Sequence, residues 1–152
     1  MKLLKMQTHS CTLYSAAMVL NEEPENLIKE LGHDGLDVVW PDHVGAARSR
    51  GVSMQEVQDL CMPRGHALAF IEAYPHSISL EGAEPYPVYS EAQASERIYK
   101  ILHRRTAILI GQMPSNLQHA CAWDGQRVFD PQGRTYELEH FPLREVWLLV
   151  DC

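Results

Sequence analysis

Three features are missing from this chain of 152 residues, and each absence narrows its function. No apolar run approaches the roughly 20 residues of a membrane-spanning helix. The apolar stretch after Met1 is too short for a signal peptide, although two lysines accompany it. A basic stripe is also missing, and the net charge of −7 argues against a nucleic-acid partner. We therefore expect one domain, residues 1–152, in the cytoplasm, with no membrane segment.

Cysteine is scarce, and its spacing excludes two further classes of protein. The four residues are Cys11, Cys61, Cys121 and Cys152. Their wide separation is typical neither of a disulfide-rich scaffold nor of a short paired metal motif. In a chain without a secretion signal, reduced thiols are expected. Any chemistry at a cysteine therefore has to come from partners that the fold brings to it.

Periodicity and capping patterns predict helices in the first two-thirds of the chain and antiparallel strands in the last third. The expected helices cover residues 11–20, 24–31, 53–62 and 90–102. The expected strands cover residues 66–73, 107–110, the 119–130 hairpin, 134–139 and 145–150. Loops are expected over 33–50 and 74–90. This order predicts an α+β fold in which one layer of N-terminal helices packs on a C-terminal antiparallel sheet.

The helix ends carry specific signals. Ser10 is placed to cap the first helix, and Ser53 with Glu56 forms a capping-box pattern at the third. The only basic cluster, residues 103–105, follows the fourth helix, where cations favour the negative end of the helix dipole.

Residues 119–130 have the pattern of a β-hairpin. Two short apolar runs flank Asp124-Gly125, a pair that favours a two-residue type I′ turn. The register that follows pairs Trp123 with Gln126, Cys121 with Val128, and His119 with Asp130. Directly opposed Cβ atoms lie about 5 Å apart on one face of a sheet. The pattern therefore predicts an imidazole and a carboxylate side by side, where the carboxylate can hold the orientation and tautomer of the ring.

Cys11 has the position of a thiol nucleophile. It begins a helix that is apolar nearly all round, and unpaired N–H groups at a helix start stabilise a thiolate. Gln7, four residues earlier, could place its side-chain NH₂ beside the backbone N–H of Cys11 and form an oxyanion hole. A nucleophile also needs a base and a group that orients the base, and His119 with Asp130 would supply both.

Asp130 has a second predicted role in the turn that follows. Asp130-Pro131-Gln132-Gly133 fits a type I turn, with Asp first, Pro second and Gly fourth. The two roles are compatible, because a turn-forming carboxylate can also face a neighbouring histidine.

Several segments together resemble the papain-like peptidases, and particularly the bacteriocin leader-processing (double-glycine) peptidases. The segment 7–20, Gln-Thr-His-Ser-Cys-Thr-Leu-Tyr-Ser-Ala-Ala-Met-Val-Leu, resembles their nucleophile segment. His119-Ala120 and Val128-Phe-Asp-Pro131 resemble their second segment. Residues 31–35 and 50–52 are similar to those of small bacterial relatives. The resemblance implies a papain-like fold and a peptide or protein substrate, without a cofactor. It also implies that Cys11 is the nucleophile, His119 the base and acid, Asp130 the orienting residue and Gln7 the oxyanion donor.

Two readings from other classes remain open. His9-Ser-Cys11 and His119-Ala-Cys121 could form a Cys₂His₂ zinc site if Cys11 lay on a strand. A papain-like fold could also bind a peptide or partner without turnover. Cys121 is expected in the core, and Trp40 could belong to the rim of a substrate cleft.

Overall fold

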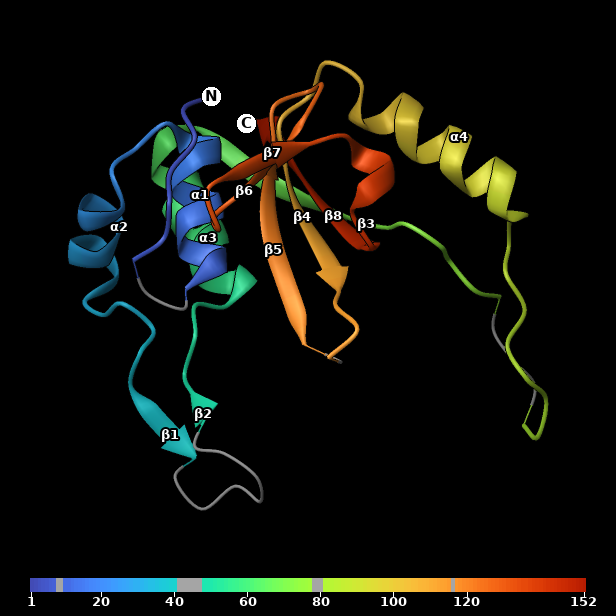
Figure 1. Ribbon diagram of the computed structural model, residues 1–152, viewed down its shortest axis with the longest axis horizontal. Coiled ribbons are helices and arrows are strands. Elements are labelled where there is room, and N and C mark those ends of the chain that lie inside the picture. The colour runs from blue at the N-terminus through green and yellow to red at the C-terminus, as the bar shows by residue number, and fades with distance from the viewer. Residues whose placement is uncertain (8–9, 41–47, 78–80, 116) are drawn as a thin grey trace.

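The protein folds as α+β, with four α-helices and a six-stranded antiparallel sheet among the described residues (Figure 1). The structure is a computed structural model, and it describes residues 1–7, 10–40, 48–77, 81–115 and 117–152. The helices are α1 (Cys11–Leu20), α2 (Pro24–Leu31), α3 (Met54–Cys61) and α4 (Glu91–Leu102). The strands of the sheet are β3 (His66–Glu72), β4 (Ala107–Gln112), β5 (Gln118–Trp123), β6 (Val128–Asp130), β7 (Arg134–Tyr136) and β8 (Leu143–Asp151).

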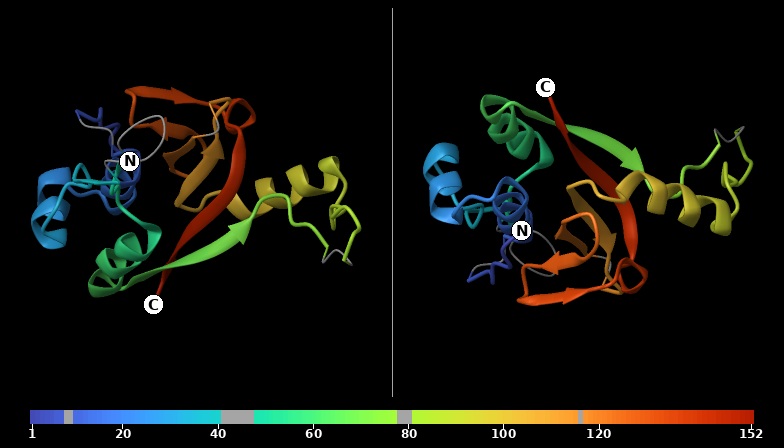
Figure 2. Two further views of the ribbon diagram at one scale, coloured as in Figure 1. Left: turned by 90° about the horizontal axis from the view of Figure 1, so that it is seen from below. Right: turned by 90° about the horizontal axis from the view of Figure 1, so that it is seen from above.

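The strand order is β3-β8-β4-β5-β6-β7, with β4 near the centre of the sheet. Ile108 and Ile110 of β4 pack with α1, α2 and α3, whereas Ala107 and Leu109 belong to the cluster that contains α4. Helices therefore contact both faces of the sheet, α1, α2 and α3 on one side and α4 through a narrow stripe on the other; Figure 2 shows α4 extending outward from that side. The expectation of a single helical layer is wrong. A continuous apolar run such as residues 107–110 in β4 is typical of a sheet buried on both sides.

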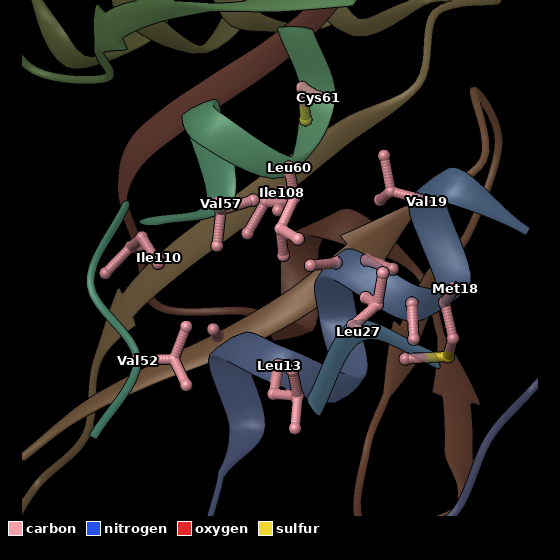
Figure 3. Close-up of a cluster of buried hydrophobic side chains, with 14 residues drawn as sticks. Leu13, Met18, Val19, Leu27, Val52, Val57, Leu60, Cys61, Ile108 and Ile110 are labelled. Carbon is pink, nitrogen blue, oxygen red and sulfur yellow. The ribbon is translucent and has the colours of Figure 1, made fainter. Parts of the chain in front are cut away.

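The larger core lies between α1, α2, α3 and the sheet (Figure 3). Leu13, Leu27, Val57 and Ile108 are fully buried there. Burying a leucine side chain contributes about 2 kcal/mol before the entropy of ordering is subtracted. This packing fixes α1 beside β5, and so sets the position of Cys11 at the start of α1.

On the other face, α4 buries only a narrow stripe of small and apolar side chains. Ala94, Ile98 and Leu102 are buried, and the indole Nε1 of Trp123 donates to the Leu102 carbonyl at 2.9 Å. The rest of α4 faces outward from the sheet.

The starts of the helices differ in their capping. Both α3 and α4 begin with complete capping boxes, Ser53 with Glu56 and Ser90 with Gln93. Ser10 does not cap α1, so that prediction is wrong: its buried Oγ makes no hydrogen bond within the described residues. The cause is the backbone, because ψ is 68° at Ser10 but 158° and 160° at the two capping serines.

Several predicted boundaries also need correction. The stretch 33–50 contains a two-stranded sheet, β1 (Val38–Trp40) with β2 (Arg48–Ser49), where only loop was expected. β7 ends at Tyr136 and a 3₁₀ turn, Leu138–His140, replaces the expected end of that strand. The side chain of Trp40, proposed as a cleft rim, lies outside the described residues. In the part of the chain that the structure describes, no helix has the length and apolar character needed to cross a membrane.

Candidate active site

The hairpin that joins β5 to β6 has a longer loop than expected. Trp123 pairs with Val128, so residues 124–127 form the loop. The prediction that His119 pairs directly with Asp130 is therefore wrong. The register is displaced by two residues, and because side chains alternate with a period of two, both side chains keep the expected face.

Two contacts explain why Asp124-Gly125 does not form the loop alone. Asp124 Oδ1 accepts the backbone N–H groups of Gln126 at 2.9 Å and Arg127 at 2.8 Å, which holds both residues in the loop. The Gly125 carbonyl accepts the N–H of Arg104, just beyond α4, at 3.2 Å. The second contact is tertiary, and no local sequence pattern encodes it.

The structure brings His119 and Asp130 together diagonally across this hairpin. His119 Nε2 lies 3.0 Å from Asp130 Oδ1, and both side chains are buried. Because Asp130 occupies Nε2, the other ring nitrogen, Nδ1, is available to a third group. The predicted imidazole–carboxylate pair therefore exists, although its register differs from the expected one.

Cys11 completes the cluster from the start of α1. The N–H of Ala120 donates to Cys11 Sγ at 3.4 Å. This contact is possible because β6 pairs with β5 only at Ala122 and Trp123, which leaves the edge of β5 beside His119 to the helix. Figure 1 shows α1 running alongside β5. Three of the four residues expected at the site thus meet in space.

The electrostatics of the cluster favour a thiolate–imidazolium pair. Burial raises the pKa of the Cys11 thiol, but hydrogen bonds with His119 and Ala120 outweigh it, so the net pKa is lowered. The hydrogen bond with Asp130, and then that with Cys11, raises the pKa of His119 to about 12. A lowered thiol pKa together with a raised imidazole pKa favours the proton on the imidazole. A thiolate is the nucleophilic form of cysteine.

Asp130 is held as a carboxylate by four hydrogen-bond donors. Its Oδ1 accepts from His119 and, at 2.8 Å, from the N–H of Gln132. Its Oδ2 accepts from the Tyr136 hydroxyl at 3.1 Å and from Arg134 at 3.4 Å. Burial raises the pKa of Asp130, but these bonds outweigh that effect and lower it. The N–H of Gly133 also donates to the Asp130 carbonyl at 2.9 Å, as the predicted turn requires.

Tyr136 is a site residue that the sequence analysis missed. It pairs with Val128 across β6 and β7, which puts it on the same face as Asp130. A signal for it was present: a hairpin with residues 131–133 as its loop brings residue 136 opposite residue 128. Burial raises the pKa of Tyr136, so its hydroxyl stays protonated and serves as a donor.

Cys121 is fully buried, as expected, but it also borders this network. Its Sγ lies 3.7 Å from the Tyr136 hydroxyl, and burial raises its pKa. Ligand atoms of His119, Cys121 and Asp130 lie within 4.8 Å of one another, a spacing that a metal ion could bridge. The Asp130 oxygens there already accept four hydrogen bonds, some of which a bound metal would have to replace.

The zinc site considered as an alternative from the sequence has a different set of ligands, His9, Cys11, His119 and Cys121. It required Cys11 on a strand, whereas Cys11 begins a helix. His9 lies outside the described residues.

Gln7 is not brought to the cluster by any hydrogen bond of the described residues. Its side chain is exposed, and its backbone N–H donates to the Tyr14 hydroxyl at 3.3 Å. Its role as oxyanion donor stays a prediction.

No family model matches the chain, and no curated protein matches it significantly.

Proposed function

We propose that the protein is a papain-like thiol hydrolase that cleaves an amide or peptide bond through Cys11, His119 and Asp130. The observation that carries this proposal is the buried His119–Asp130 pair beside a thiol whose pKa is lowered. Nucleophile, base and orienting group are the three parts that covalent amide hydrolysis needs. The resemblance of residues 7–20 and 119–131 to double-glycine peptidases supports the same reading.

In the proposed reaction, the Cys11 thiolate attacks the carbonyl carbon and its electron pair forms the C–S bond. The carbonyl oxygen becomes an oxyanion, for which the N–H groups at the uncapped start of α1 are suitable donors. The protonated His119 gives its proton to the leaving amine as the C–N bond breaks. His119 then takes a proton from water, which attacks the thioester and releases the acid. The overall change is amide plus water to acid plus amine.

We further propose a peptide or protein as substrate and a reducing compartment, the cytoplasm, as the place of action. All four cysteines are free, and the proposed reaction consumes a reduced thiol. Isopeptide cleavage, deamidation and acyl transfer use the same three catalytic groups. They differ in the amide that is attacked and in the group that accepts the acyl.

Alkylation of the native protein with iodoacetamide, mapped by mass spectrometry, tests the nucleophile. Cys152 is exposed and serves as an internal reference thiol. Cys11 should react faster than Cys152 at pH 6, with an inflection below the ordinary thiol value of about 8.5. The sign follows from the lowered pKa: reactivity rises as pH rises through it. A faster reaction at Cys152 or Cys61 would remove Cys11 from this role.

Turnover requires a second measurement. Wild type and Cys11→Ser are incubated with a diverse peptide library, and new peptide termini are identified by mass spectrometry. New termini that need Cys11 support the hydrolase. A reactive Cys11 that yields neither new termini nor an acyl-enzyme with an activated ester would favour a binding module instead. One zinc per chain in purified protein, with unfolding on chelation, would favour the metal reading.

A further inference from the structure

A cavity of about 710 Å³ lies on the face of the sheet that α4 covers, away from Cys11. Its apolar floor consists of Ile98, Trp123, Phe141 and Leu143, all buried. Figure 2 shows α4 on the side of the sheet opposite α1, α2 and α3. The volume falls in the range of small-molecule sites, about 300–1,000 Å³.

The cavity exists because α4 presents short or polar side chains to it. Glu91, Ser95 and Tyr99 recur at four-residue spacing and lie along one side of the helix, above the buried stripe. Ser95, in the middle of this row, contributes only a small side chain to the lining. The gap is therefore built into the sequence of α4 and needs no movement of the helix.

The charge of the lining is of one sign. Glu91 comes from α4, and Glu137 and Glu139 come from the segment after β7, so carboxylates stand on two walls. The described lining contains neither lysine nor arginine. Its one imidazole, His103, stacks on Tyr99 with the two ring centroids 6.1 Å apart. Glu137 has an ion pair with Arg127 at 3.6 Å and Glu139 has one with His140 at 3.6 Å, but exposed pairs of this kind are weak.

We propose that this cavity binds a small organic cation: a primary amine on an aromatic or branched apolar body. The apolar body would lie on Trp123 and Phe141, and the ammonium would face the carboxylates of the two walls. A cleft lined by one sign of charge raises the local concentration of the opposite ion. Aromatic rings also attract an ammonium group placed over their faces. This site is independent of Cys11 and of the reaction proposed there.

The test uses 3-phenylpropylamine as the probe, titrated at pH 8 and followed by NMR and calorimetry. At this pH an ordinary imidazole is neutral while the amine stays charged. Saturable binding is expected, with shifts of the Trp123 indole and Phe141 signals. 3-Phenylpropionate, which has the same body and the opposite charge, should bind about tenfold more weakly, equivalent to about 1.4 kcal/mol.

Matched variants separate the cavity from the rest of α4. Ser95→Trp fills the gap from an exposed position and should abolish binding, and Glu91→Gln should weaken it severalfold. Glu96→Gln removes a carboxylate that is on the same helix but outside the cavity, and should bind as wild type does. Cys11→Ser should also bind normally, whatever its activity.

Equal affinity for amine and carboxylate would overturn the assignment of a cation, because it would leave only an apolar cavity. Unchanged binding in Ser95→Trp, or the absence of saturable binding in wild type, would remove the site.

Discussion

The starts of α1 and α3 show two opposite uses of the same structural element. At α3, the Ser53 hydroxyl accepts the Glu56 N–H at 3.3 Å, and the Glu56 carboxylate accepts the Ser53 N–H at 2.9 Å. At α1, Ser10 makes no such bond, and Cys11 follows it directly. Among the described residues, the third helix thus has a side-chain cap on its N–H groups and the first helix has none from Ser10.

The difference concerns two properties: a cap stabilises the helix, whereas its absence favours a reactive thiolate at Cys11. A capping box adds about 1 kcal/mol to a helix and brings a carboxylate beside its N-terminus. Such a carboxylate at α1 would oppose the thiolate of Cys11. At α3 it is held ionised: burial raises the pKa of Glu56, but bonds from Ser53, His33 and Arg50 lower it to about 2. An uncapped start thus costs α1 some stability and leaves room for negative charge at sulfur.

The largest effect is expected when the imidazole of His119, the partner of Cys11 at the start of α1, is removed. His119→Ala should reduce turnover roughly 10⁴–10⁶-fold, because both the base and the proton donor are lost. The inflection of Cys11 alkylation should also move to higher pH, since His119 is the main group that lowers this pKa. His140→Ala, an exposed histidine, serves as control. An unmoved inflection would show that the start of α1 acts without His119.

Gln7→Ala tests whether the backbone N–H groups at the start of α1 stabilise the oxyanion alone or together with the Gln7 side chain. The acylation rate should fall by about 10²–10³, or roughly 3–4 kcal/mol, because an oxyanion donor acts on charge that develops in the transition state. The measurement is single-turnover acylation by an activated ester, with Thr8→Ala as the neighbouring control. Equal rates for Gln7→Ala and wild type would leave the oxyanion to the backbone.

Tyr136→Phe should have an intermediate effect, lowering turnover about tenfold, because Asp130 loses one charged hydrogen bond. The Tyr136 hydroxyl contributes to the lowered pKa of Asp130, so its removal raises that pKa. Loss of Cys11 reactivity in acid should then begin at higher pH. The alkylation rate measured against pH checks this, with the exposed Tyr86→Phe as control. If the alkylation rate of Cys11 at low pH followed the same curve as in wild type, Tyr136 would contribute to packing only.

The smallest effects compare the two helix starts directly in urea unfolding. Ser53→Ala should lower the free energy of unfolding by about 1 kcal/mol, because it removes a cap. Ser10→Ala should change it by less than about 0.5 kcal/mol, because its hydroxyl makes no bond within the described residues. Equal losses in both variants would contradict the comparison.

Local patterns predicted the helices well, because their signals lie within a few residues. The bounds of α1 and α2 and the capping box of α3 are confirmed. The hairpin was harder, because its loop depends on a contact between Gly125 and Arg104 that the local sequence does not contain. The site survived the error because a two-residue displacement preserves the face of a strand.

The remaining misses have tertiary causes. The position of α4 on the second face follows from burial of Trp123 and Leu109, residues that a strand pattern alone assigns to no particular helix. Ser10 had the right residue type for a cap, but its ψ of 68° is not that of the capping serines. Tyr136 could have been predicted by extending the strand register across the turn at 130–133 into β7.

The contact between Cys11 and Ala120 joins residues 109 positions apart. During synthesis Cys11 leaves the ribosome early, whereas His119 and Asp130 follow more than a hundred residues later. Until β5, β6 and β7 have paired, Cys11 has no imidazole partner and remains an ordinary thiol. If Cys11 is the nucleophile, as proposed, the order of these residues delays formation of its site until the last strands of the sheet have been synthesised.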